Sequence, residues 1–351
     1  ITSAINQLYL QQYLFMKALF PKNLISCWNQ AITQSAAIVL ATHVNPDGDA
    51  MGALTGLGAF LRQQGYRVTC VCPSPYPDFL GFLDPGKDIL VYTCHKEKVL
   101  KAVDKADIVV AVDVSGLSRM EELGSALSES RAFKVLMDHH TDPVTEDFDL
   151  VFSTTRVSSS CELIFRLLHA WKPKAVFSKE QATAFLTGII TDTNQFANSV
   201  YPETFHAASI MHLWGADSET IFSQVYQNFT LNRMHLMGYA LQNIRILPQF
   251  GAAYIVLTRD VLEAFDYQNG DTESFVNFPL AIKGINVSAF FLQRKDHIKV
   301  SLRSKGAIAV NGIARQFFNG GGHYNASAGK MEDAPEKIEG LLKEALGTVI
   351  A

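Results

Sequence analysis

The sequence predicts an α/β fold, with a mostly parallel N-terminal sheet flanked by helices and a smaller C-terminal α+β domain across a cleft. Three observations lead to this prediction. Residues 36–41 and 106–112 are short, nearly continuous apolar segments, which are typical of strands covered on both faces of a parallel sheet. Longer segments with helical periodicity alternate with such strands, as in βαβ units. After about residue 250 the order changes, and several strands precede two helices.

The composition fits a globular protein of two domains. The chain has 351 residues, of which 48% are hydrophobic and 18% charged, and its net charge is −4. This charge gives no general attraction to nucleic acid, so a polyanionic substrate would have to be bound by local positive charge or by metal. The five cysteines form no CxxC pair, and neither a membrane span nor a signal peptide is evident. We therefore expect reduced thiols, a cytoplasmic location and no membrane partner.

The first expected elements surround an acidic loop. A helix is expected over residues 1–30, a strand over 36–41, and a helix from 50 to about 64, after which Gly65 ends it. A second strand is expected over 67–72, and the prolines that follow it up to residue 87 indicate a loop, either a lid or a passive crossing. The acidic loop over residues 43–49 follows the first strand, at the edge where open α/β sheets usually bind ligands.

Several later elements end in polar residues. The expected strand over 106–112 is followed by Asp113, and the strand over 132–137 by Asp138, His139 and His140. Helices are expected over residues 158–170 and 179–190, 203–214, 218–228 and 233–246.

The domain boundary is expected where this pattern changes. We expect a first domain over residues 1–230, a helical linker over 231–249 and a second domain over 250–351. The second domain should contain strands over 253–257, 286–292 and 298–302 and helices over 310–318 and 335–346.

The polar residues at the ends of these elements share one chemistry. They are His43, Asp47, Asp49, Asp113, Asp138, His139, His140 and Asp192. Carboxylate oxygens and imidazole nitrogens without thiolate suit Mn²⁺ or Mg²⁺. Their number favours two metals with a bridging carboxylate, which would activate a water for phosphoryl hydrolysis. We expect Asp138 to hold a metal-binding histidine through its other ring nitrogen. The structural alternative is that several of these residues are helix caps or buried polar groups.

These residues form motifs that resemble those of a known superfamily. The four motifs of the DHH phosphoesterase superfamily resemble, in order, His43-Val44-Asn45-Pro46-Asp47-Gly48-Asp49, Asp113, Asp138-His139-His140 and Thr191-Asp192-Thr193. The run Phe318-Asn319-Gly320-Gly321-Gly322-His323 resembles the signature of the DHH-associated C-terminal domain. The resemblance spans residues 43–329. The size of the chain is most similar to that of the nanoRNase/pAp-phosphatase branch, the bifunctional oligoribonucleases.

The resemblance implies a role for each motif residue. It implies that His43 and Asp47 bind one metal, that Asp49 and His139 bind the other, that Asp113 bridges them and that Asp192 completes the first site. It also implies that His140 faces the substrate phosphate, so that His140 and Asp113 are the expected catalytic residues. Many relatives have a glycine after the fourth motif, where this chain has Asn194-Gln195-Phe196. This departure leaves the shape of the nearby substrate wall open.

A basic segment of the second domain is the expected substrate clamp. Residues 283–330 contain eight Lys and Arg residues and one acid, Asp296. Within it, Gly320, Gly321 and Gly322 can turn backbone N–H groups toward an anion, His323 adds a donor, and Arg303 could bind a phosphate through two hydrogen bonds. A solvated charged face and a flexible glycine loop are the alternatives.

The function implied by the resemblance is metal-dependent phosphoester hydrolysis. The expected substrates are short single-stranded RNA or DNA oligonucleotides, cut from an end to mononucleotides, and the nucleotide bisphosphate 3′-phosphoadenosine 5′-phosphate, cut to AMP. Two divalent metals, with Mn²⁺ preferred to Mg²⁺, are the expected cofactors, and a homodimer is compatible with the sequence. The alternatives are a linear or cyclic dinucleotide phosphodiesterase and, in another class, a nucleotide-binding regulator without turnover.

Overall fold

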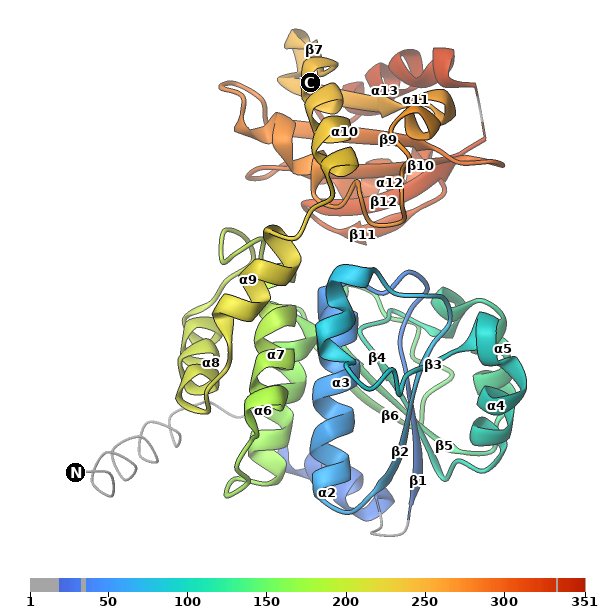
Figure 1. The fold of residues 1–351 in the computed structure, drawn as a ribbon, viewed down its shortest axis with the longest axis vertical. Coiled ribbons are helices and arrows are strands. Elements are labelled where there is room, and N and C mark those ends of the chain that lie inside the picture. Colours follow the sequence, from blue (N-terminus) through green and yellow to red (C-terminus); the bar gives the residue numbers. More distant parts are fainter. Residues whose placement is uncertain (1–18, 33–35, 333, 351) are drawn as a thin grey trace, which may run out of the picture. The chain divides into compact units, whose positions relative to one another are not determined.

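The computed structural model describes residues 19–32, 36–332 and 334–350. Its contacts divide the chain into two compact units, Ile1–Asn228 and Phe229–Ala351, and each unit is described by itself (Figure 1). Most of the helix expected over residues 1–30 lies outside the described residues, and its last part is the helix α2, Lys22–Ala31.

The first unit contains a parallel sheet of six strands in the order β3-β2-β1-β4-β5-β6. The strands are β1 (Ala37–Ala41), β2 (Arg67–Cys72), β3 (Leu90–Val91), β4 (Ile108–Val112), β5 (Phe133–Asp138) and β6 (Leu150–Ser153). The expected parallel sheet is therefore confirmed. The order reverses between β1 and β4, which is the position where such sheets bind ligands beyond the carboxyl ends of their strands.

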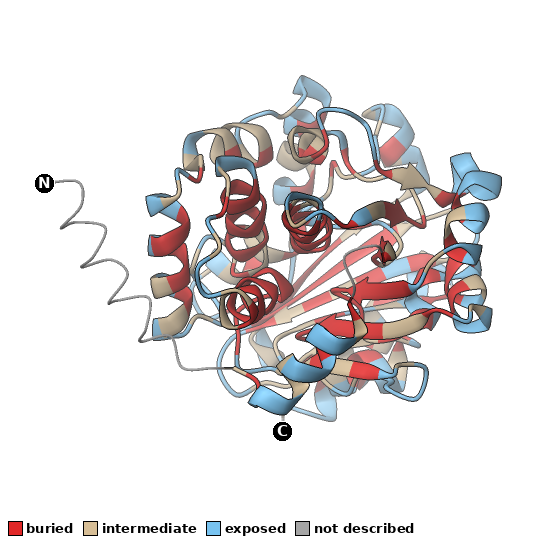
Figure 2. Cartoon of the chain, turned by 90° about the horizontal axis from the view of Figure 1, so that it is seen from below, coloured by how far each residue is buried: buried red, intermediate tan, exposed pale blue. Residues whose placement is uncertain are grey.

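Helices cover both faces of this sheet, and the strand β1 shows why its sequence is apolar throughout. Ile38 and Leu40 point into a core that includes the helices α3 (Gly48–Gln63), α6 (Ser160–Trp171) and α7 (Lys179–Asp192). Val39 and Ala41 point into a second core with the helices α4 (Tyr92–Asp104) and α5 (Glu122–Glu129). Figure 2 shows buried residues along the strands and on the inner sides of the surrounding helices.

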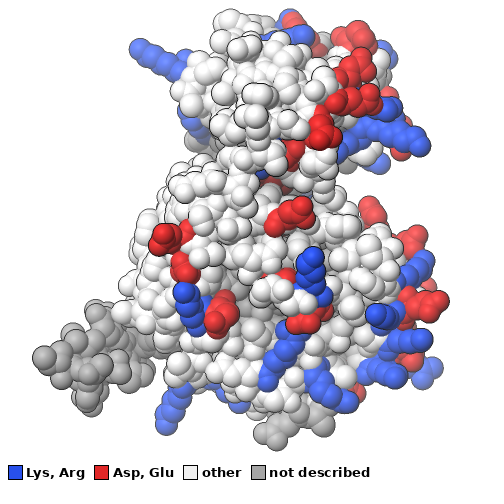
Figure 3. Space-filling view, viewed as in Figure 1, with Lys and Arg blue, Asp and Glu red and all other residues white. Residues whose placement is uncertain are grey.

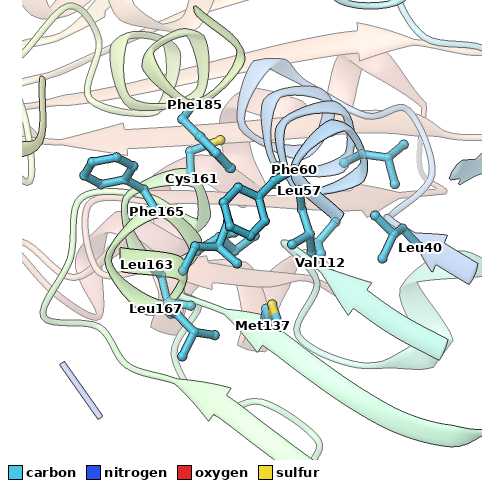
Figure 4. Packing of buried hydrophobic residues seen from close by; sticks show 14 of the residues in the cluster. Leu40, Leu57, Phe60, Val112, Met137, Cys161, Leu163, Phe165, Leu167 and Phe185 are labelled. Carbon is cyan, nitrogen blue, oxygen red and sulfur yellow. The ribbon is translucent and has the colours of Figure 1, made fainter. Parts of the chain in front are cut away.

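The larger core joins the sheet to α3 and α6. Leu40, Val112 and Met137 come from three neighbouring strands, and Leu57 and Phe60 of α3 pack near them (Figure 4). Each is fully buried, and burial of such a side chain stabilises the fold by roughly 1.5–3 kcal/mol. The helices α8 (Pro202–Leu213) and α9 (Ser218–Tyr226) complete the unit, close to their expected bounds.

Helices α3 and α7 approach so closely that glycine is required between them. A Cβ atom at Gly52 would lie 2.4 Å from the carbonyl oxygen of Ala184, and one at Gly48 would lie 2.4 Å from Thr191 Oγ1. The first contact is with backbone, which cannot rotate away. This packing brings the start of α3 beside the end of α7, where Asp192 is the last helical residue.

The second unit contains a mixed sheet of six strands in the order β11-β12-β10-β9-β8-β7. Its elements are α10 (Leu231–Gln242), β7 (Arg245–Leu247), β8 (Ala252–Leu257), α11 (Arg259–Ala264), β9 (Val287–Gln293), β10 (Ile298–Ser304), α12 (Val310–Phe317), β11 (Gly321–His323), β12 (Ala326–Met331) and α13 (Ile338–Gly347). The segment expected as a linker, 231–249, belongs to this unit, because Leu236 and Ala240 of α10 pack against the sheet and β7 pairs with β8.

Most of the glycine run forms the strand β11 and not a flexible loop, which the sequence left open as an alternative. Gly321–His323 pairs in an antiparallel manner with β12, so most of the glycine run lies in the sheet. From the sequence we did not predict β3, β6, β7, β11, β12 or the helices α4, α5 and α11, most of which are short or carry mixed polar patterns. No helix in the described part of the chain is both long and apolar enough to cross a membrane.

The contact between α3 and α7 leads to a prediction about stability. We expect Gly52→Ala to lower the free energy of unfolding of the first unit by about 2 kcal/mol, because the added methyl group overpacks a backbone contact. Gly81→Ala is the matched control, since no atom lies within 4 Å of the position that its methyl group would take. All three tryptophans, Trp28, Trp171 and Trp214, lie in this unit, so tryptophan fluorescence in a urea titration reports its unfolding. Equal stability of the two variants would contradict the prediction.

Candidate functional site

The candidate site lies at the carboxyl ends of β1, β4 and β5, on both sides of the point where the strand order reverses. His43 follows β1, Asp113 follows β4 and Asp138 is the last residue of β5. Asp47 and Asp49 lie at the start of α3, which follows β1. The sheet therefore brings together residues that are up to about 95 positions apart in the sequence.

Asp113 is the centre of the site. Its Oδ2 lies 3.6 Å from His43 Nε2, and its Oδ1 lies 3.6 Å from His139 Nε2. It is buried, and its backbone has a φ of +53°, a left-handed conformation that costs a non-glycine residue roughly 1–2 kcal/mol. The carboxylate lies between the two histidines, with one oxygen facing each ring.

Asp113, Asp138 and His140 form one group of possible ligating atoms, and two further groups also contain Asp113. One is His43, Asp47 and Asp113, here called the His43 group, and the other is Asp49, Asp113 and His139, the His139 group. Within each group the atoms lie within 4.8 Å of one another. Because Asp113 belongs to both groups, one carboxylate can bridge two cations.

Local hydrogen bonds orient His43 and Asp47. His43 Nδ1 lies 2.9 Å from the carbonyl oxygen of Val44, and a ring that donates there presents Nε2 to Asp113. Asp47 caps α3, with its Oδ1 accepting hydrogen bonds from the backbone N–H groups of Asp49 and Ala50. The expected alternative of a helix cap is thus correct for Asp47, and it is compatible with metal binding through Oδ2.

Asp49 is held by the start of α6, which the sequence did not reveal. Its Oδ2 accepts a hydrogen bond of 2.7 Å from the backbone N–H of Ser160, and its Oδ1 accepts one of 2.9 Å from that of Cys161. The Asp49 carboxylate fits beside α7 because residue 188 is a glycine. A Cβ atom at Gly188 would lie 2.5 Å from Asp49 Oδ1. A run of three serines before Cys161 was the available signal, since serine-rich helix starts expose N–H donors.

The charges of the site favour a bound cation. Burial and the nearby charges of Asp113 and Asp192 raise the pKa of Asp49 well above its ordinary value. Burial also opposes the charge of Asp113, but its contact with His43 and the nearby histidines hold its pKa below the ordinary range. Burial lowers the pKa of His43, whereas the nearby Asp113 and Asp47 raise it. The net pKa of His43 lies above its ordinary value. Divalent cations bound by oxygen and imidazole ligands would neutralise these carboxylates without proton uptake.

Asp192 lies beside the His139 group. Its Oδ2 is 3.4 Å from His139 Nε2, which is also 3.7 Å from Asp49 Oδ2. The resemblance implied that Asp192 completes the site of His43 and Asp47, whereas the contact described here is with His139 of the other group. The reason is the close packing of α3 and α7, which brings the end of α7 next to Asp49.

Asp138 holds His140 and not the expected metal-binding histidine. Its Oδ1 lies 2.7 Å from His140 Nδ1, and its Oδ2 accepts a hydrogen bond from the backbone N–H of His140. The chain turns directly after β5, which folds residue 140 back over the carboxylate, as in an Asx turn. Burial lowers the pKa of His140, but Asp138 and the other nearby carboxylates raise it to about 10, which favours the protonated ring.

The residues of the expected clamp lie on neighbouring strands of the second unit. In the register of the sheet, Arg303 of β10 and His323 of β11 are both opposite Ala326 of β12, so the three side chains share one face. The next row on this face contains Ser301, Ala328 and Gly321. These rows form a strip of small side chains between an arginine and a histidine, here called the β10–β11 strip.

The three glycines of the run Gly320–Gly322, of which Gly321 belongs to this strip, have different roles. A Cβ atom at Gly320 would lie 2.0 Å from the carbonyl oxygen of Ala328, and Gly322 has a φ of +136°. Both positions therefore need glycine for the backbone itself. Gly321 has room for a side chain, with Arg315 Nε at 4.0 Å as its nearest neighbour. Gly321 is thus the residue of the run at which the backbone leaves space for a ligand.

The fold and the site define a class of protein. Acidic and imidazole residues around a shared carboxylate, at the switch point of a parallel sheet, form a divalent-metal site for phosphoester hydrolysis. The class is that of the phosphoric ester hydrolases. The family model described as the DHH family, N-terminal domain, matches residues 37–189, and the model of the DHHA1 domain matches residues 251–350. The chain belongs to the DHH family.

Three known proteins are similar over most of the chain. The bifunctional oligoribonuclease and PAP phosphatase of Bacillus subtilis is 30% identical over 305 residues, which cover 84% of this chain and 89% of that protein. A cyclic-di-AMP phosphodiesterase of Geobacillus thermodenitrificans is 26% identical and covers 90% of this chain, but only 48% of its own length is matched. The crystal structure of an exopolyphosphatase-related protein from Bacteroides fragilis has a TM-score of 0.89 and 35% identity, and it covers 95% of this chain and 98% of its own.

The buried carboxylates lead to a prediction about metal binding. We expect Mn²⁺ at about 100 times its Kd to stabilise the first unit by about 2.7 kcal/mol relative to the protein in chelator. This stabilisation should appear as a rise in Tm on adding Mn²⁺, measured by tryptophan fluorescence with and without chelator. Asp113→Asn should lose most of the rise because it removes the charge shared by both groups, whereas Asp78→Asn, at an exposed acid of the 3₁₀ helix Asp78–Leu83, should keep it. An undiminished rise in Asp113→Asn would contradict the shared role of Asp113.

Proposed function

We propose that this protein hydrolyses short single-stranded RNA or DNA oligonucleotides from an end to mononucleotides, and 3′-phosphoadenosine 5′-phosphate to AMP, with two Mn²⁺ ions. The observation that carries the proposal is the position of Asp113 between the His43 group and the His139 group. The relatives named oligoribonuclease and PAP phosphatase support the choice of substrates, because they match this chain over nearly their whole length.

Each residue of the site has a proposed role. His43, Asp47 and Asp113 would hold one cation, and Asp49, Asp113 and His139 the other, with Asp192 beside the second. Two divalent cations in such a site draw charge from a phosphoryl oxygen and supply an ionised water as the nucleophile. His140 would donate a hydrogen bond from Nε2 to a phosphoryl oxygen, because Asp138 holds Nδ1 and raises the pKa of the ring.

The β10–β11 strip is the proposed phosphate clamp of the second unit. Arg303 and His323 are separated by one strand, so their Cα atoms lie about 10 Å apart at the usual spacing of sheet strands. Ala326 between them is small and leaves room for a phosphate on the sheet. Arg303 would bind the phosphate through two charge-assisted hydrogen bonds, and His323 and the Gly321 N–H would add donors. Recognition of a terminal phosphate would favour short substrates, and base identity would contribute little.

The charge distribution is consistent with binding at local sites. Figure 3 shows acidic and basic side chains intermixed on the displayed face of the first unit, over helices such as α4 and α5. The displayed face provides no extended basic track for long nucleic acids. Short substrates held at one end would suit this surface better than long duplexes.

A cyclic-dinucleotide phosphodiesterase is the second candidate function. The observation that favours it is the similarity to the cyclic-di-AMP phosphodiesterase, which extends over 90% of this chain. We rank it second because the chain corresponds to only about half of that protein, 48% of its length.

A substrate panel distinguishes these functions. With Mn²⁺ present, kcat/KM would be measured for a dinucleotide, a five-residue oligomer, 3′-phosphoadenosine 5′-phosphate, a cyclic dinucleotide and pyrophosphate. We expect the linear oligomers and the bisphosphate to exceed the other two by at least about tenfold, or ~1.4 kcal/mol of transition-state free energy. A highest value for the cyclic dinucleotide would support the second candidate, and a highest value for pyrophosphate would reject both.

The clamp leads to a separate prediction about KM. We expect Arg303→Ala to raise KM for 3′-phosphoadenosine 5′-phosphate about tenfold or more, with kcat nearly unchanged, because a charge-assisted hydrogen bond contributes roughly 1.5–3 kcal/mol. Arg259→Ala is the control, since Arg259 is exposed on α11 and pairs with Glu263. An unchanged KM in Arg303→Ala would exclude Arg303 from the clamp.

A further inference from the structure

The start of α6 contacts both carboxylates of the His139 group. Ser160, the first residue of this helix, donates its backbone N–H to Asp49 Oδ2 at 2.7 Å and its side-chain hydroxyl to Asp113 Oδ1 at 2.9 Å. Ser160 is fully buried, so water does not compete for these hydrogen bonds. One residue outside the DHH motifs thus links a ligand of one group to the ligand that both groups share.

The start of α6 is itself fixed in place. Ser159 caps the helix, and its hydroxyl accepts a hydrogen bond from the backbone N–H of Glu162. The fully buried carboxylate of Glu162 accepts hydrogen bonds from Ser158, from the hydroxyl of Thr204 on α8 and from Arg166. A buried carboxylate with this many donors resists movement, because displacement would leave polar groups without partners. Ser160 is therefore presented to Asp113 from a rigid support.

The two hydrogen bonds of Ser160 can be separated by mutation. The bond to Asp49 comes from the backbone and survives any side-chain change, whereas the bond to Asp113 comes from the hydroxyl alone. Asp113 is a residue with strained backbone, and its Oδ1 also faces His139 Nε2. Without the hydroxyl, the carboxylate would lose the contact that orients Oδ1 for the His139 group.

We propose that Ser160 is a positioning residue that holds Asp113 in the orientation needed by both groups and thereby sets the affinity for divalent metal. This proposal rests on the two-metal centre proposed above. Residues that hydrogen-bond to metal ligands typically change metal affinity 10- to 100-fold when they are mutated. A merely structural serine at a helix start would change stability and leave metal affinity unaltered.

A pair of neighbouring serines provides the test. Ser160→Ala and Ser159→Ala each remove one buried hydroxyl from the same helix start, but only Ser160 contacts Asp113. The full-length chain would be stripped of metal with chelator and titrated with Mn²⁺ alone, with binding followed by calorimetry and by Tm. We expect the Kd for Mn²⁺ to rise about tenfold or more in Ser160→Ala. Ser159→Ala should lower Tm in chelator, as loss of a cap does, and should leave the Kd within about twofold of wild type.

Each outcome of the titration has a definite meaning. An unchanged Kd in Ser160→Ala, or an equal rise in Ser159→Ala, would overturn the positioning role while the metal centre stands. Absence of Mn²⁺ binding by the wild-type chain would overturn the metal centre as well. If Ser160→Ala does not fold, Ser160→Gly also removes the hydroxyl without adding a donor or a metal ligand, and an unchanged Kd in that variant would equally reject the proposal.

Discussion

The structure of the site depends on one constraint, which is the burial of like-charged carboxylates around Asp113. Asp49 and Asp113 are buried and near each other, and burial together with Asp113 raises the pKa of Asp49. Buried carboxylates are costly unless other groups stabilise them. Here hydrogen bonds and nearby histidines stabilise Asp49 and Asp113. The histidines and carboxylates together form a ligand set for divalent cations. Bound divalent cations would offset the mutual repulsion of these buried carboxylates.

The fold of the first unit supports this constraint through close packing. Gly52 and Gly188 remove the side chains that would separate α3, α6 and α7, so that Asp49 meets the N-terminal N–H groups of α6. The order of the parallel strands places the ends of β1, β4 and β5 next to one another. The helix start and the sheet edge thus provide a rigid frame in which small changes in a supporting residue affect the metal ligands.

The second unit uses sheet register for a different purpose. Cross-strand pairing places Arg303, Ala326 and His323 in one row on the same face of the sheet. The glycine run that precedes His323 serves two needs, since Gly320 and Gly322 permit close approach to the backbone of β12 and Gly321 leaves space above the strip. Glycine-rich sequence alone does not distinguish a mobile anion-binding loop from a strand pressed against its neighbour. The register of β11 and β12 makes that distinction.

The sequence by itself indicated a parallel sheet with four of its six strands, the approximate bounds of α3, α6 and α7 and most of the candidate ligands, because hydrophobic period and polar residues at strand ends are local properties. It also indicated the family, through short motifs whose order survives in the chain. It could not determine the partner of Asp138, the side on which Asp192 lies, the support from Ser160 or the place of residues 231–249. Those features depend on which helices approach one another and on which backbone N–H groups they expose. Only the tertiary structure decided them, since contacts between residues more than a hundred positions apart, such as Asp49 and Ser160, leave no periodic pattern in the sequence.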